Sequence, residues 1–227
     1  MYLDDIVTAQ KRGEAKGITS ICSAHPWVLK TILGSNDFHG TARQGRRSRS
    51  RATDVTTPVL IEATCNQVNQ LGGYTGMTPA DFVTYVRGIA AENNFPFENI
   101  ILGGDHLGPN VWQNEPAESA MEKSKVLIRD YVQAGFIKIH IDCSMKLADD
   151  PPGLLNPEII AKRTAELAKV AERTLTPNPS PAGRGGHVLR YIIGTEVPVP
   201  GGATEYEEGV SVTHVEDARQ TIQVTRE

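Results

Sequence analysis

The chain has 227 residues, of which 39% are hydrophobic and 22% charged, and its formal net charge is −4 at pH 7. These values are ordinary for a globular protein, and the weak negative charge argues against a general affinity for nucleic acid or for an anionic membrane surface. No apolar run approaches the roughly 20 residues that a membrane-spanning helix needs.

The N-terminal segment carries acids at Asp4 and Asp5 and has no apolar core, so it is not predicted to be a secretory signal. The cysteines Cys22, Cys65 and Cys143 are odd in number, widely spaced and embedded in apolar runs. This pattern favours buried free thiols in a reducing compartment over disulfides or a cysteine-based metal site. We therefore predict a cytoplasmic protein.

Two strands and a helix are predicted in the first part of the chain. The segments 17–25 and 58–67 are short, apolar and flanked by polar or glycine-rich sequence, which is typical of strands. A helix is predicted over 78–94, because Thr78 can cap it, Pro79 occupies the first helical position and apolar residues then recur at helical spacing.

The same pattern repeats in the middle of the chain. Residues 99–106 form a third predicted strand, and residues 116–135 form a helix that Gly135 closes. Glycine is common at this position because its backbone readily adopts the left-handed conformation that ends a helix. A fourth strand is predicted over 136–144.

The last part of the chain has two predicted helices and a fifth strand. The helix over 156–174 begins with Asn156 as its cap, and the strand covers 189–197. A final helix is predicted over 211–227, with Thr213 as its cap.

Strands that alternate with helices pair in parallel through right-handed crossovers, which is typical of doubly wound sheets and of (β/α)8 barrels. No G-x-G-x-x-G motif follows the first strand, so a dinucleotide-binding sheet is disfavoured. A barrel normally needs about 250 residues, and only five βα units are predicted here. We therefore expect an α/β fold with one truncated TIM-barrel domain over 1–227.

Two stretches interrupt this pattern and are predicted to be disordered insertions. Residues 34–57 carry five arginines within 43–51. A basic run can bind nucleic acid, but this one lacks aromatic residues for base stacking and has no basic surroundings. Residues 174–186 are rich in Pro, Gly and Ser, which is typical of a flexible spacer.

Polar residues follow the predicted strands at their carboxyl ends. In a parallel sheet these ends meet at one rim, which can hold a small polar ligand, with backbone N–H groups of the glycine-rich loops receiving a phosphate. The rim residues are Glu62, Thr64, Asn66, Gln67 and Asn69; Asp105, His106 and Asn110; His140, Asp142, Ser144 and Lys146; and Glu196.

Asp105 and His106 stand side by side between glycines at the end of the third strand. His106 could bind a divalent metal while Asp105 transfers a proton on a bound substrate. Alternatively, Asp105 caps the following turn and His106 is an ordinary hydrogen-bonded histidine. An isolated Asp-His pair favours the second interpretation.

Three other residues have alternative interpretations. Glu62 lies in a buried run, where a carboxylate must be paired or liganded, and a salt bridge to an inner lysine or arginine is the simpler explanation. His140 lies in an apolar strand and is either a ligand or a core histidine, with the core favoured. His25 either lines the rim or packs against Trp27.

Five long segments together resemble one known family. They are "GITSICSAHPWVL", "PVLIEATCNQVNQLGGYTGMTPADF", "ILGGDHLGPNVWQ", "AGFIKIHIDCSMKLADDPPGLL" and "YIIGTEVPVPGGA". These segments are similar to the Z-type, non-catalytic subunit of class II D-tagatose-1,6-bisphosphate aldolase, a family also labelled tagatose-6-phosphate kinase. The resemblance covers most of the chain outside 34–57 and 174–186.

The resemblance implies an aldolase-type (β/α)8 barrel that supports the activity and stability of a catalytic partner in carbohydrate catabolism. The zinc belongs to that class II partner subunit, which cleaves tagatose 1,6-bisphosphate into dihydroxyacetone phosphate and glyceraldehyde 3-phosphate. By the match to class II aldolases, Asp105 takes the proton-transfer position and His106 a vestigial zinc-ligand position. Glu196 takes the position of the glutamate in a Gly-Gly segment, and Glu62 is a further catalytic candidate.

The resemblance also has departures. The chain stops before the strands that carry the remaining zinc-binding histidines, and neither His187 nor His214 has the expected context. We therefore expect a non-catalytic, truncated copy, for which zinc is a possible cofactor but is expected in the partner subunit. Two alternatives remain: a non-functional copy, and a sugar-phosphate enzyme, either a kinase or a metal-dependent lyase. A kinase is disfavoured because the sequence has no G-x-x-x-x-G-K-[ST] motif.

Overall fold

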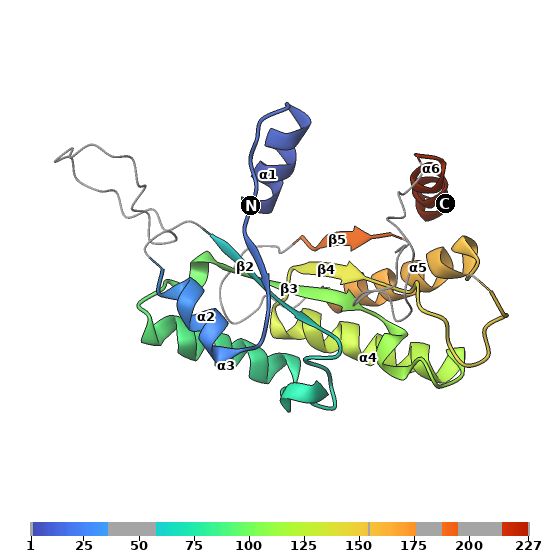
Figure 1. The fold of residues 1–227 in the computed structure, drawn as a ribbon, viewed down its shortest axis with the longest axis horizontal. Helices are drawn as coiled ribbons and strands as arrows, with labels where there is room; N and C mark the ends of the chain where they lie inside the picture. Colours follow the sequence, from blue (N-terminus) through green and yellow to red (C-terminus); the bar gives the residue numbers. More distant parts are fainter. Residues whose placement is uncertain (1, 36–57, 154, 176–187, 195–214, 227) are drawn as a thin grey trace, which may run out of the picture. The chain divides into compact units, whose positions relative to one another are not determined.

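The structure is a computed structural model, and it describes residues 2–35, 58–153, 155–175, 188–194 and 215–226 (Figure 1). The helices are α1 (Tyr2–Lys11), α2 (Pro26–Leu33), α3 (Pro79–Glu92), α4 (Ala117–Ala134), α5 (Pro157–Leu175) and α6 (Val215–Arg226). The strands are β1 (Ser20–Cys22), β2 (Val59–Thr64), β3 (Ile100–Leu107), β4 (Lys138–Ile141) and β5 (Arg190–Ile193). Three 3-10 turns are η1 (Gly73–Thr75), η2 (Phe97–Asn99) and η3 (Pro109–Trp112).

The strands form an open sheet in the order β1-β2-β3-β4-β5. Strand β1 pairs with β2 and β2 with β3 in parallel, so that Cys22 lies opposite Glu62 and Thr64 opposite Asp105. The predicted α/β class is confirmed, and strands in sequence order are what five βα units of a partial (β/α)8 barrel produce.

The chain divides into two compact units. The first unit comprises Met1–Asp105 and Ala134–Lys138, and the second comprises His106–Gln133 and Ile139–Glu227. The boundary passes through β3 and β4, so each unit contains part of both strands. In the first unit Ile137 N donates to Leu102 O at 3.0 Å, and in the second Asp142 N donates to Leu107 O at 3.0 Å.

Side chains alternate between the two faces of each strand. On β4, Ile139 and Ile141 are fully buried, whereas Lys138 and His140 lie on the opposite face. The apolar face continues along β2 through Val59, Ile61 and Ala63, all with no exposed area. The apolar alternation in the sequence therefore corresponds to one apolar face and one polar face of the sheet.

The first unit confirms the predicted helix start at Thr78. Its hydroxyl accepts from Asp81 N, and the Asp81 carboxylate accepts from Thr78 N, which forms a capping box around Pro79 at the start of α3. Helix α3 buries Phe82, Val86 and Ile89 along one side.

Helices α1 and α2 were not expected from the sequence. Helix α2 begins with His25, whose Nδ1 accepts from Trp27 N at 3.2 Å, and Pro26 occupies the first helical position. Histidine is not among the usual capping residues, so this start gives no clear sequence signal. His25 therefore caps a helix, and Trp27 remains 77% exposed.

Two further predicted helix signals are confirmed, one in each unit. Asn156 Oδ1 accepts from Glu158 N at 2.9 Å at the start of α5, and Gly135, which begins the turn after α4, has φ +98°. Helices α4 and α5 bury Leu127, Ile128 and Leu167, among other residues. Strand β5 begins one residue later than the predicted 189–197, residues 195–197 of that prediction lie outside the described residues, and Ile192 and Ile193 are about half exposed.

Several sequence-based expectations lie outside the described residues. They concern most of the insertions predicted over 34–57 and 174–186, the cap Thr213, and the residues His187, Glu196 and His214. All three cysteines are free, as expected. Cys65 and Cys143 are buried, but Cys22 is exposed, because it ends β1 at the margin of the sheet. None of the described helices combines the length and hydropathy of a membrane span.

Candidate functional site

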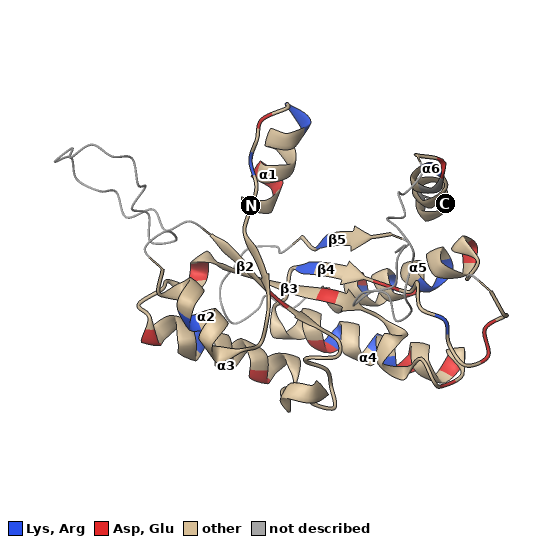
Figure 2. Cartoon of the chain, in the orientation of Figure 1, with Lys and Arg blue, Asp and Glu red and all other residues tan. Residues whose placement is uncertain are grey.

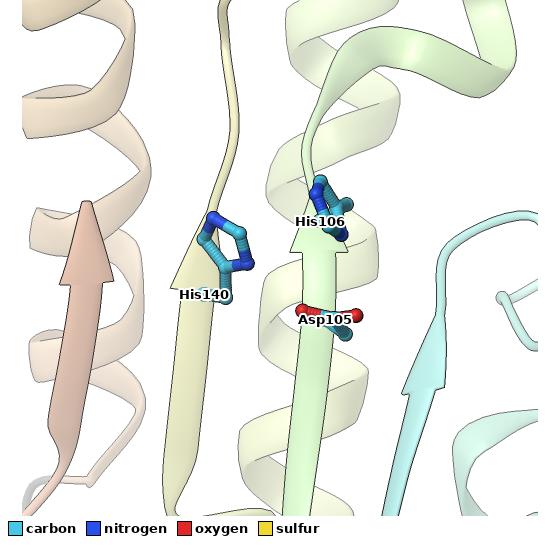
Figure 3. Close-up of side chains that lie close together, drawn as sticks. All are labelled: Asp105, His106 and His140. Atoms are coloured by element: carbon cyan, nitrogen blue, oxygen red, sulfur yellow. The ribbon is translucent and has the colours of Figure 1, made fainter. Parts of the chain in front are cut away.

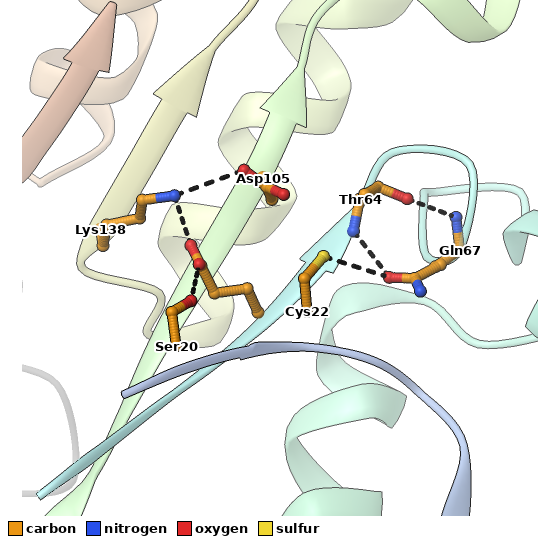
Figure 4. A network of polar contacts seen from close by, with 7 residues as sticks. Ser20, Cys22, Thr64, Gln67, Asp105 and Lys138 are labelled. Atoms are coloured by element: carbon orange, nitrogen blue, oxygen red, sulfur yellow. Dashed lines mark hydrogen bonds and ion pairs between the residues drawn. The ribbon is translucent and has the colours of Figure 1, made fainter. Parts of the chain in front are cut away.

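A buried ion-pair cluster lies on the polar face of the sheet in the first unit (Figure 4). Lys138 Nζ forms an ion pair with Glu62 Oε1 and lies 3.5 Å from Asp105 Oδ1. Ser20 Oγ donates a hydrogen bond to Glu62 Oε2. The Lys138 and Glu62 side chains are each only 7% exposed, so neither charge can rely on water for solvation. Figure 2 shows an acidic stretch on β3 and a basic stretch at the start of the neighbouring strand β4.

Gly103 makes this cluster possible. It lies opposite Glu62 in the register of β2 and β3, and a Cβ atom at Gly103 would stand 2.7 Å from Glu62 Oε1. Because β3 has no side chain at this point, Lys138 on β4 reaches across it to Glu62 on β2. A glycine in the interior of a strand usually marks such a close approach.

The cluster identifies the partner of Glu62. The salt bridge to an inner lysine is present, and it explains how a carboxylate that is 5% exposed is tolerated in the core. Lys138 itself was not singled out from the sequence. The signal that could have revealed it is its spacing of two residues from His140, which puts both polar residues on one face of an apolar strand.

Cys22 lies beside the same carboxylates. Its Sγ is 4.0 Å from Gln67 Oε1, and Gln67 Oε1 also accepts from Thr64 N at 2.9 Å (Figure 4). Although the residue as a whole is exposed, burial of the sulfur and the neighbouring Asp105 carboxylate raise the pKa of the Cys22 thiol to about 12. The thiol therefore stays protonated at neutral pH.

His106 has an unusual backbone conformation. Its φ is +48°, in the left-handed region that residues with a side chain rarely adopt. Consecutive residues of a regular strand point to opposite faces, so Asp105 and His106 would normally diverge. The turn of the backbone at His106 changes this direction and brings its ring against His140, with ring centroids 4.4 Å apart (Figure 3).

His106 and His140 bring two metal-ligand nitrogens together in the second unit. One nitrogen of each imidazole lies within 4.8 Å of the other. Both residues are partly buried. Imidazole nitrogens are suited to zinc and similar divalent ions.

Gly108 fixes the backbone just after His106. A Cβ atom at Gly108 would overlap the carbonyl oxygen of Asp142, so only glycine lets these two segments pass each other. Asp142 in turn accepts from Ser144 N at 2.8 Å and from Ser144 Oγ at 2.6 Å. Asp142 therefore shapes the turn after β4.

The loop after β2 is also held by its own polar residues. Asn69 Nδ2 donates to Cys65 O at 2.9 Å, and Asn69 Oδ1 accepts from Leu71 N and Gly73 N. Asn69 is only 3% exposed. Asn69, one of the predicted rim residues, therefore uses its side chain to hold the backbone of this loop in place.

Comparison with known proteins identifies the family. The model of the family described as "D-tagatose-1,6-bisphosphate aldolase subunit GatZ/KbaZ-like" matches residues 3–227. The chain belongs to this GatZ/KbaZ-like family.

Individual relatives of this family agree. The chain is 51% identical over 221 residues to the D-tagatose-1,6-bisphosphate aldolase subunit GatZ of Salmonella gallinarum (strain 287/91 / NCTC 13346), and equally to that of Salmonella enteritidis PT4 (strain P125109). Each match covers 97% of this chain and 47% of the relative. The chain thus spans about half the length of these GatZ relatives.

A solved structure shows the same fold. The crystal structure of a probable tagatose 6 phosphate kinase from Sinorhizobium meliloti 1021 matches with a TM-score of 0.70 and 43% identity, over 93% of this chain and 44% of that chain. The resemblance inferred from the sequence is therefore confirmed. The catalytic roles of Glu62, Asp105 and Glu196 and the metal-binding role of His106 remain predictions.

Proposed function

We propose that this chain is a non-catalytic auxiliary subunit of a class II tagatose-1,6-bisphosphate aldolase. It binds the catalytic zinc subunit and supports that partner's activity and stability in the breakdown of tagatose 6-phosphate and related sugars. The single observation that carries the proposal is the 51% identity over 97% of the chain to proteins named as an aldolase subunit. The free cysteines support a reducing compartment, and we assign this role to the cytoplasm.

The contacts of Lys138 favour an auxiliary role over sugar-phosphate catalysis. An enzyme that cleaves a sugar bisphosphate commonly holds the phosphates with cationic side chains as well as backbone N–H groups. Lys138 is the buried lysine on the polar face among the residues that the structure describes, and Glu62 and Asp105 already pair with it. A third, phosphate anion would have to displace one of these carboxylates.

The test is reconstitution with a catalytic class II tagatose-bisphosphate aldolase subunit. Turnover of tagatose 1,6-bisphosphate and the thermal stability of the catalytic subunit are measured with and without this chain. We expect the chain to co-elute with the catalytic subunit and to raise at least one of the two quantities. If neither changes and the proteins elute separately, the auxiliary role is wrong and a non-functional copy is the better description.

A metal-dependent sugar-phosphate lyase is the second candidate, and the adjacent imidazoles of His106 and His140 in the second unit favour it. Under this alternative, the chain alone releases dihydroxyacetone phosphate from tagatose 1,6-bisphosphate, and Asp105→Ala and His106→Ala abolish the release. A kinase activity, suggested by the name of the Sinorhizobium protein, is tested with ATP and tagatose 6-phosphate in the same preparation.

A further inference from the structure

We infer that a groove between α4 and α5 binds the phosphate group of a small organic phosphate through Arg129 and Arg173. The groove has a volume of about 430 Å3 and is lined by Arg129, Gln133, Val170, Arg173 and Thr174. All five residues belong to the second compact unit. The inference goes beyond the auxiliary function, because it concerns a ligand of the helices and not a contact with the catalytic subunit.

The two helices lie side by side along this groove. Lys125 Nζ of α4 pairs with Glu166 Oε1 of α5 at 2.6 Å. Residues four positions apart stay on one side of a helix, so Arg129 follows Lys125 on α4 and Val170 follows Glu166 on α5. The groove therefore continues the seam between the helices toward their C-terminal ends.

The charge changes along this seam. Glu166 balances Lys125, but one turn later Val170 takes the place of an acid beside Arg129. The described lining of the groove contains two guanidinium groups and no carboxylate. This composition favours an anion in the groove.

The acids next to the two arginines in sequence are absent from the described lining. Asp130 is partly buried, and burial raises the pKa of its carboxyl group although the charge of Arg129 opposes this shift. Glu172 precedes Arg173 and accepts a hydrogen bond from Tyr191 Oη at 2.7 Å. A positive charge therefore remains in the groove for a ligand.

The helix ends account for only one of the two arginines. A cation in the last turn of a helix is stabilised by the backbone carbonyls there, an effect that falls off within that turn. Arg173 lies in the last turn of α5, whereas α4 has no basic residue in its last turn, and Arg129 precedes it. The carbonyls of α4 therefore do not explain Arg129, whereas an anion shared with Arg173 does.

The donors define the class of ligand. A guanidinium group has paired N–H donors that match two oxygens of a phosphate, and two such groups balance the double charge of a phosphate monoester. Gln133 adds an amide donor, whereas the Thr174 hydroxyl donates to Val170 O at 2.7 Å. The volume lies within the range of about 300–1,000 Å3 typical of small-molecule sites, so the organic part of the ligand also has room.

The groove is separate from the predicted rim. Helix α4 ends just before β4 begins, so its last turns belong to the amino end of that strand. Asp142 and Ser144 follow β4 at its carboxyl end, where the rim is predicted and where enzymes with this architecture have their active sites. A ligand of Arg129 and Arg173 is therefore a second ligand of the chain.

The test is calorimetric titration of the full chain with inorganic phosphate, with glycerol 3-phosphate and with glycerol, at constant ionic strength so that charge screening is unchanged. We expect one glycerol 3-phosphate per chain, bound at least as tightly as inorganic phosphate, and no binding of glycerol. Arg129→Gln and Arg173→Gln should each weaken binding by about 10-fold, the loss expected for a hydrogen bond between charged groups.

Two further variants separate a specific site from general charge. Arg129→Lys keeps the charge without the paired donors and should also weaken binding, by less than Arg129→Gln. Lys162→Gln removes an exposed charge of α5 outside the lining and should bind like the unmodified chain. Arg129, Arg173 and Lys162 are all exposed, so the variants should fold, as circular dichroism would show.

Three results would overturn the inference: no saturable binding of glycerol 3-phosphate, binding of inorganic phosphate alone, or an equal loss in Lys162→Gln and in the folded arginine variants. None of them bears on the reconstitution with the catalytic subunit. Conversely, a phosphate ester bound through the two arginines stands even if that reconstitution fails.

Discussion

Lys138 is the residue whose removal should cost most in the first unit. Its replacement by methionine leaves Glu62 as a buried carboxylate without its ion pair. Breaking a buried pair from one side typically costs about 3–5 kcal/mol, because the remaining charge is unsolvated. We therefore expect Lys138→Met to lower the free energy of unfolding in urea by that amount.

The exposed pair of Lys30 and Glu92 provides a matched control for this prediction. Its nitrogen and oxygen lie 2.9 Å apart, but the two side chains are 51% and 61% exposed. Exposed ion pairs contribute about 0–1 kcal/mol, so Lys30→Met should have a small effect. Equal losses for the two variants would contradict the importance of burial.

Two glycines give an opposite pair of predictions. Gly108→Ala should destabilise the chain by about 1–3 kcal/mol, because its Cβ would overlap the carbonyl oxygen of Asp142 and force the backbone apart. Gly88 lies in α3 with open space around it, so Gly88→Ala should stabilise by up to about 1 kcal/mol. Thermal unfolding of both variants tests the signs.

The residue that pairs with Glu62 could not be predicted from the sequence. The run around Glu62 indicated that a buried carboxylate needs a partner, and the partner exists. Its identity depends on the register that places Gly103 opposite Glu62, which lets Lys138 reach across β3. Registers between strands far apart in sequence are set by packing, so the pattern of any single strand does not contain them.

At the scale of elements, Arg163 on α5 anchors the segment that follows β4. Its guanidinium donates to both oxygens of Asp150, at 2.8 and 2.6 Å, and the Arg163 residue is 8% exposed. The hydrogen bonds from Arg163 hold the pKa of Asp150 below its usual value. Asp150 Oδ2 also accepts from Leu147 N, which ties the loop to the pair.

The lowered pKa of Asp150 gives a prediction for the pH dependence of stability. A carboxyl group whose pKa is lower in the folded state stabilises it above the unfolded pKa, and this contribution disappears as the pH falls through the folded value. Arg163→Met should therefore be less stable than the unmodified chain at pH 7. The difference should narrow below about pH 4, as unfolding in urea across this range would show. A constant difference would contradict the ion pair.

Elements with local start and stop signals were predicted well. Helices α3, α4 and α5 begin and end within a few residues of the predicted positions, because their caps are short-range interactions of Thr78, Asn156 and Gly135. Strand β1 is shorter than the predicted 17–25, because a strand at the end of the sheet order pairs on one side only. Helix α2 was missed because a histidine caps it.

At the scale of the whole molecule, the exposed residues of β5 favour association. This strand is the last in the sheet order among the described strands, and Ile192 and Ile193 are 47% and 44% exposed. Apolar strands at a sheet margin tend to pair with other chains. We expect the isolated chain to self-associate, and Ile192→Lys should reduce this in sedimentation velocity experiments.

Val7 on α1 provides the control for self-association, since it is 48% exposed but lies on a helix. Val7→Lys should leave the sedimentation profile unchanged. An unmodified chain that remains monomeric and unfolds cooperatively in urea would contradict the expected association.

The two tryptophans of the chain differ sharply in environment, and this decides what optical methods report. Trp27 is 77% exposed in the first unit, whereas Trp112 is 6% exposed in the second. An indole already in water changes its emission little on denaturation, so the spectral red shift comes mainly from Trp112. Fluorescence melting curves therefore follow the second unit, and a dye or tryptophan introduced near Phe82 is needed to observe the first.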